Sequence, residues 1–219
     1  MLSNMKGDLQ VEELLKRIRR LVNDGLKSGR AKKDIMRQVS DELARWDLNG
    51  QKEALYKQME KQFDWVDRKT MDGTEREMVG EILANAGSQY TSTKKGLRKD
   101  LENRVRPLLD AGKDRKDIRN ELESVIGKHR NYAETIARTA IAGFDGADTV
   151  VKAKQAGLSR FTYKGPPAER GFCRAVMKAA AEGKTWTEEE IKGMSNGQGL
   201  DVLLYCGGFN CRHYWGGVE

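Results

Sequence analysis

The chain of 219 residues is long enough for one substantial domain or two small ones. Charged residues make up 33% of it and the mean hydropathy is -0.73. Because no run approaches the roughly eighteen apolar residues of a membrane span, we expect no contact with a membrane. The net charge of +7 is spread evenly along the chain, which is typical of solvated helix faces. This charge permits contact with nucleic acid but does not establish it.

The first residues and the cysteines both bear on the cellular setting. Residues 1–8 lack an apolar run followed by a small-residue cleavage site, so we expect no secretory signal. The three cysteines are an odd number and all lie after residue 172, unlike a disulfide framework spread over the chain. A reducing, cytoplasmic setting is therefore the simplest interpretation.

The N-terminal half predicts a series of helices. It has no proline before Pro107 and is rich in residues that favour helices. Apolar residues at three- and four-residue spacing predict a stripe along the first helix, namely Leu14, Leu15, Ile18, Leu21, Val22 and Leu26. Thr74 followed by Glu77 predicts a capping box that begins a further helix. We expect residues 1–91 to form an extended helical arm, whose stripe must be covered by a partner or by its own helices.

Two similar segments surround Gly29 and Gly112. In both, we expect a helix to stop at the glycine and a basic-rich helix to begin within a few residues. Because only a few positions match, shared capping physics explains the similarity better than an internal duplication does.

Residues 92–219 predict a small α+β domain, so the expected fold class is mainly α with a short sheet. Apolar spacing predicts a long helix from about Asn131 to Lys154. The alternating stretch Phe161–Tyr163 predicts a strand, and Asp201–Tyr205 is the second strand candidate.

The strongest chemical candidate is a set of three thiols and an imidazole, Cys173, Cys206, Cys211 and His213. Such a set can close a tetrahedral site around one structural zinc ion. The Gly-Gly pair after Cys206 allows a sharp turn, and an extended chain would point Cys211 and His213 to the same side. Cys173 would come from a separate helix. Two alternatives stay open, reduced cysteines packed in the core and a Cys206–Cys211 disulfide.

The residues for catalysis are few, and we expect no enzymatic activity. His129 and His213 are the two histidines, and His129 lies between Lys128 and Arg130, where we expect a solvated position at a helix start. No nucleophile motif or phosphate-binding loop is present. The acidic run 188–190 is better explained as the N-terminus of a helix with a capping box, Thr187 with Glu190.

Three landmarks lie in order between about Leu109 and Trp215. They are Ala111-Gly112-Lys113 with Asp117-Ile118, then Ala133-Glu-Thr-Ile-Ala-Arg-Thr139, and last Cys173-Arg174 followed by Asn210-Cys211-Arg212-His213. Together they are fairly specific, and in them the chain resembles the phage Mu F-type minor head proteins, also called phage head morphogenesis proteins. The resemblance covers about half of the chain, within the predicted domain 92–219.

This resemblance implies a structural minor head protein of a tailed phage or prophage, acting in head assembly or genome delivery. The implied location is the virion head near the portal, after assembly in the host cytoplasm. The implied partners are the portal protein and other head or connector proteins, with weak, non-specific contact to packaged DNA. The alternative from another class is a zinc-dependent nucleic-acid-processing or toxin-like enzyme. An appended catalytic domain would distinguish the two, and 219 residues leave little room for one.

Overall fold

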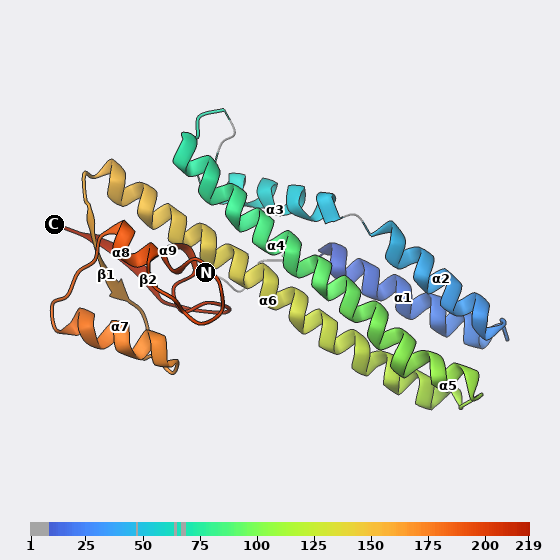
Figure 1. The fold of residues 1–219 in the computed structure, drawn as a ribbon. Helices are drawn as coiled ribbons and strands as arrows, with labels where there is room; N and C mark the ends of the chain where they lie inside the picture. The colour runs from blue at the N-terminus through green and yellow to red at the C-terminus, as the bar shows by residue number, and fades with distance from the viewer. Residues whose placement is uncertain (1–8, 47, 64, 67–68) are drawn as a thin grey trace. The chain divides into compact units, whose positions relative to one another are not determined.

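The computed structural model describes residues 9–46, 48–63, 65–66 and 69–219, so the expectation about a secretory signal concerns residues outside it. The described chain is mainly α-helical and carries a small two-stranded antiparallel sheet near its C-terminus, which confirms the predicted fold class (Figure 1). Within these residues, every helix is too short or too polar to cross a bilayer.

The chain forms two compact units, each assembled from two stretches. Unit 1 combines Met1–Glu53 with Gly87–Ala137, and unit 2 combines Ala54–Ala86 with Arg138–Glu219. Helices α3, α4 and α6 therefore contribute residues to both units. This grouping follows contacts in space, and the division into residues 1–91 and 92–219 stays a prediction about domains.

Unit 1 is helical. Its elements are α1 (Leu9–Lys27), α2 (Lys32–Arg45), the start of α3 (Leu48–Gln62), the second part of α4 (Gly73–Asp100), the π-helix η1 (Leu101–Val105), α5 (Arg106–Asp110) and the first part of α6 (Arg115–Gln155). The turns after α1 and α5 are alike, because Gly29 and Gly112 both have a positive φ and the next residue bonds back five positions, Arg30 to Gly25 and Lys113 to Leu108. Both turns therefore have the glycine helix stop that the sequence predicts, and the choice of shared capping over duplication stays an interpretation.

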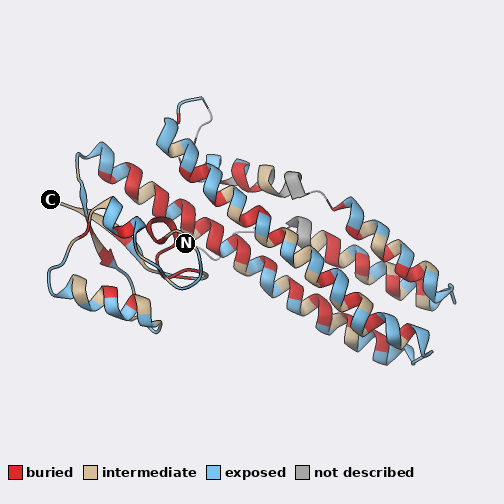
Figure 2. Cartoon of the chain, viewed as in Figure 1, coloured by how far each residue is buried: buried red, intermediate tan, exposed pale blue. Residues whose placement is uncertain are grey.

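Four of the six residues of the predicted stripe of α1 are buried inside unit 1, and the other two, Leu21 and Leu26, are partly exposed. Leu14, Leu15, Ile18 and Val22 are each at most 3% exposed, and α1 packs against α2, which buries Ile35 and Val39 (Figure 2). Burial of apolar surface of this kind contributes about 1.5–3 kcal/mol for each large side chain. The chain's own helices therefore cover the four buried residues of the stripe, which was one of the two predicted outcomes.

The prediction that His129 lies solvated at a helix start is wrong. Helix α6 begins at Arg115, and the Asp114 carboxylate accepts hydrogen bonds from the backbone N–H groups of Lys116 and Asp117. His129 thus lies inside the helix, four and seven residues after Val125 and Leu122, on the same buried face. Its side chain is 2% exposed, and its Nε2 donates to the Asp100 carboxylate at 2.8 Å.

The Asp100–His129 pair predicts that unit 1 loses stability in mild acid. Burial lowers the pKa of His129 below 6.5, and the bond to Asp100 opposes this only in part. As the pH falls through 6.5, the unfolded chain takes up a proton that the folded chain does not, so stability present above this pH is lost below it. Burial alone would raise the pKa of Asp100, but hydrogen bonds from Lys128 and His129 lower it, so its contribution is lost at still lower pH.

Urea unfolding at about pH 7.5 and about pH 5.5 tests this prediction. We expect a lower midpoint at the acidic pH, and a clearly smaller difference for His129→Gln, which removes the titrating group. An equal pH dependence in the two proteins would show that His129 does not contribute.

Unit 2 carries the sheet and the cysteines. Besides the remainder of α3, α4 and α6 it contains β1 (Arg160–Lys164), α7 (Gly171–Ala181), α8 (Glu188–Lys192), α9 (Val202–Tyr205) and β2 (Tyr214–Val218). Strands β1 and β2 pair antiparallel, with Tyr163 opposite Trp215 (Figure 1). The core of this unit is aromatic, because Phe144, Phe161, Trp186 and Trp215 are each at most 4% exposed.

Two helix starts in unit 2 differ in how well the sequence predicted them. The capping box of Thr187 with Glu190 is confirmed at the start of α8. The one predicted for Thr74 is wrong, because α4 begins at Gly73 and the capping residue is Asp72, which exchanges backbone and side-chain hydrogen bonds with Glu75 at 2.8 and 2.9 Å. The carboxylate of Asp72 performs the role expected of the Thr74 hydroxyl.

The strand at Phe161–Tyr163 is confirmed as part of β1, whereas the strand predicted at Asp201–Tyr205 is wrong. Those residues form the short helix α9, because the Asp201 side chain accepts from the N–H of Leu204 at 3.0 Å and caps a helical turn. The partner of β1 is instead β2.

Candidate metal centre

Unit 2 brings together three of the four predicted metal ligands. Cys173 lies in the first turn of α7, while Cys211 and His213 lie in the segment between α9 and β2. The ligand atoms of these three residues all lie within 4.8 Å of one another, so the group can hold a metal ion. Among the described residues, no other group of three such side chains is placed this way.

The turn between α9 and β2 positions Cys211. Cys206 and Asn210 both have a positive φ, at 51° and 55°, and Cys211 N–H donates to Gly208 at 3.0 Å. A non-glycine residue in this conformation costs roughly 1–3 kcal/mol, and such strain is concentrated at functional sites. The Arg170 guanidinium fixes the turn by donating to the carbonyls of Gly207 and Phe209 at 2.9 and 2.5 Å.

Gly207 is a glycine because the thiols leave no space for a side chain. A Cβ atom there would lie 2.2 Å from Cys173 Sγ and 3.1 Å from Cys211 Sγ. The Gly207 N–H also donates to Cys211 Sγ at 3.2 Å. A backbone donor to the sulfur is the kind of outer contact that orients a metal ligand.

The orientation of His213 suits a ligand. Its Nε2 lies 2.9 Å from the Pro166 carbonyl oxygen, which only accepts, so Nε2 carries the proton. The other ring nitrogen, Nδ1, then presents its lone pair 3.4 Å from Cys211 Sγ. Metal-binding histidines almost always donate their second ring N–H in this manner.

Electrostatics favour neutral side chains when no metal is bound. Burial raises the pKa of the Cys173 thiol and raises that of Cys206 still further. Burial also lowers the pKa of His213, and the positive charges of Arg212 and Arg170 act in the same direction. A metal ion would have to displace protons from the thiols, and its own charge supplies the stabilisation that the buried thiolates otherwise lack.

Cys206 is not a member of the three-residue group. It is 2% exposed and ends α9, and its pKa is raised by burial and by the neighbouring Cys211 and Cys173 thiols, so it lies beside the group. Its role as the fourth ligand stays a prediction. All three cysteines are free thiols in the structure, so the alternative Cys206–Cys211 disulfide is not formed.

Two residues of this site, Tyr163 and Arg170, are not predicted from the sequence. Tyr163 was recognised only as part of a strand, and Arg170 was not singled out. The alternation of Phe161 and Tyr163 indicated two inward side chains, and it carried no signal that one of them meets the cysteines. The cation at position 170 lies three residues before a cysteine, which is a weak signal on its own.

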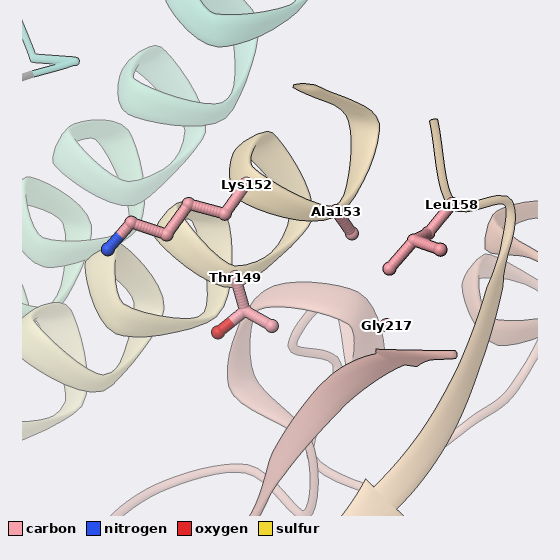
Figure 3. A pocket seen from close by; sticks show the side chains of 5 residues that line it. All are labelled: Thr149, Lys152, Ala153, Leu158 and Gly217. Atoms are coloured by element: carbon pink, nitrogen blue, oxygen red, sulfur yellow. The ribbon is translucent and has the colours of Figure 1, made fainter. Parts of the chain in front are cut away.

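A shallow depression of about 260 Å³ lies elsewhere on unit 2 (Figure 3). It is lined by Thr149, Lys152, Ala153, Leu158 and Gly217. Figure 3 shows the Lys152 side chain extending away from Ala153 and Leu158, and its ammonium group bonds to Asp148 at 2.8 Å. The depression therefore lacks the converging polar groups of a small-molecule site.

Comparison with known proteins gives no further assignment. No family model matches the chain, and neither a curated protein nor a solved structure matches it significantly.

Proposed function

We propose that this chain is a structural minor head protein of a tailed phage or prophage, associated with the portal and acting in head assembly or genome delivery. The observation that carries the proposal is that two of the three landmarks of the resemblance to Mu F-type proteins, the helix landmark and the last one, meet at Thr139 in unit 2. The N–H of Asn210 donates to the Thr139 hydroxyl at 3.3 Å, which joins the last landmark to the helix landmark. Cys173 and Cys211 come within 3.9 Å, Sγ to Sγ.

We further propose that the centre holds one structural zinc ion. A tetrahedron with bonds of about 2.3 Å to sulfur and about 2.0–2.1 Å to nitrogen has edges of about 3.8 Å between sulfurs and about 3.5 Å between sulfur and nitrogen. The corresponding distances are 3.9 Å between Cys173 and Cys211 and 3.4 Å between Cys211 and His213. Cys173, Cys211 and His213 would hold the ion, which would join α7 to the turn before β2.

The surface of the described residues supports a polar rather than an apolar interface with the portal. The only large apolar side chains exposed among them are Tyr132 and Tyr214. Because Leu14, Leu15, Ile18 and Val22 of the stripe are buried inside unit 1, the stripe as a whole is not free to enter a groove on a partner. Contact with portal subunits and with packaged DNA would then depend on charged helix faces, and we expect it to weaken as salt rises.

Affinity capture of the tagged protein from particle-producing cells tests this function. We expect mass spectrometry to identify the ring-forming portal protein in the captured fraction, and the tagged protein to sediment with assembled heads. The same tagged protein, expressed in cells that make no particles, is the control. Capture of nucleic acid or host enzymes without portal protein would contradict the proposal and favour the enzyme or toxin alternative.

A further inference from the structure

We infer that Tyr163 is a positioning residue of the metal centre, setting the thiolate ligands by its hydroxyl and the imidazole ligand by its ring. The inference rests on the zinc centre proposed above. Tyr163 is 2% exposed and lies on β1, directly opposite Trp215 of β2. Its side chain contacts three of the four predicted ligands, Cys173, Cys211 and His213.

The hydroxyl of Tyr163 faces the cysteines. It donates to Cys173 Sγ at 3.4 Å and lies 3.9 Å from Cys211 Sγ. The buried phenol hydroxyl thus lies between the sulfur atoms of two predicted ligands.

The ring of Tyr163 faces the histidine. It is parallel to the His213 imidazole, with an interplanar angle of 7° and 5.2 Å between centroids. Edge contacts with Trp215, at 4.7 Å between centroids, and with Phe172, at 6.3 Å, fix the ring from its other sides. Since the Pro166 carbonyl holds Nε2 and the tyrosine holds the ring plane, the direction of Nδ1 is determined.

The hydroxyl acquires its role once a metal is bound. Cys173 and Cys211 are then thiolates, which accept stronger hydrogen bonds than thiols do. The Gly207 N–H donates to Cys211 and the Tyr163 O–H donates to Cys173, so each thiolate has its own hydrogen-bond donor. These donors withdraw electron density from sulfur and compensate the charge of two thiolates in a buried site.

The test compares purified full-length wild-type protein with Tyr163→Phe, which keeps the ring and removes only the hydroxyl. Zinc affinity is measured by competition with a chromophoric chelator, and the sulfur ligands are monitored through the thiolate-to-metal charge-transfer band of the cobalt(II) form. We expect roughly 10–100-fold weaker zinc binding. We also expect the band to move to lower energy, because a thiolate without its donor gives up charge more readily. Tyr132→Phe, the same change at an exposed tyrosine of unit 1, should alter neither quantity.

Each result decides the inference. Unchanged affinity and an unchanged band in Tyr163→Phe would show that Tyr163 only packs, while the zinc centre would stand. Wild-type protein that binds no metal would overturn the inference together with the centre, and would leave the head-assembly proposal to the capture experiment. If Tyr163→Phe does not fold, difluorotyrosine at position 163 replaces it. Its more acidic hydroxyl should move the band to higher energy, and an unmoved band would overturn the inference.

Discussion

Protein purified under reducing conditions should contain about one equivalent of zinc, and Cys211→Ser should contain none. Cys211 is the ligand that connects the site, because its sulfur lies 3.9 Å from Cys173 Sγ and 3.4 Å from His213 Nδ1. At free zinc a thousand times the dissociation constant, binding stabilises the folded state by about 4 kcal/mol, which the variant would lose. The helices have their own buried core, so we expect the loss to fall on residues 201–215. Elemental analysis gives the zinc content, and limited proteolysis with near-ultraviolet circular dichroism follows the C-terminal segment.

Cys206→Ser is the matched control, because it makes the same chemical change at a buried thiol outside the three-residue group. If it keeps the zinc, the centre consists of Cys173, Cys211 and His213, with a fourth position that no cysteine fills. If it loses the zinc, the four-ligand set predicted from the sequence is correct. A fully folded wild-type protein without metal would contradict the zinc proposal and leave the cysteines as ordinary core residues.

Local spacing predicted the parts of the site that are close in sequence. Cys211 and His213 were expected to point to one side of an extended segment, and their ligand atoms lie 3.4 Å apart. The Gly-Gly pair was expected to allow a sharp turn, and Gly207 proved to be packed against both thiols. These predictions hold because side-chain alternation and glycine's lack of Cβ act over a few residues.

The remaining parts of the site depend on contacts between distant segments, which spacing does not encode. Tyr163 meets Cys211 across 48 residues, and a buried aromatic in a strand looks the same whether it faces a core or a metal ligand. The run Asp201–Tyr205 is too short to distinguish a helical from a strand periodicity, and its apolar residues suit a strand. It forms a helix because Asp201 caps the first turn. The prediction of a solvated His129 is wrong because it rested on the charged neighbours Lys128 and Arg130. The helix begins at Arg115, and His129 lies on its buried face.

A large loss of stability is also expected on substituting Gly146, where α6 approaches α9 within unit 2. A Cβ atom there would lie 2.4 Å from the Leu204 carbonyl oxygen and 3.1 and 3.2 Å from two further backbone atoms of that residue. Backbone cannot rotate away as a flexible side chain can, so Gly146→Ala must displace α9. We expect it to destabilise the protein by about 1–3 kcal/mol or more, which outweighs the gain of up to about 1 kcal/mol from alanine in a helix.

Gly127→Ala, in the same helix, separates the steric clash from the gain in helix propensity, because nothing lies within 4 Å of its Cβ position. It should stabilise the protein by about 0.5–1 kcal/mol through helix propensity alone. Urea unfolding of both variants measures the difference, and equal stabilities would contradict the close approach of α6 and α9. Because α9 leads directly into Cys206 and the turn that holds Cys211, Gly146→Ala should also weaken zinc binding. Gly127→Ala, which changes unit 1, should leave zinc binding unaltered.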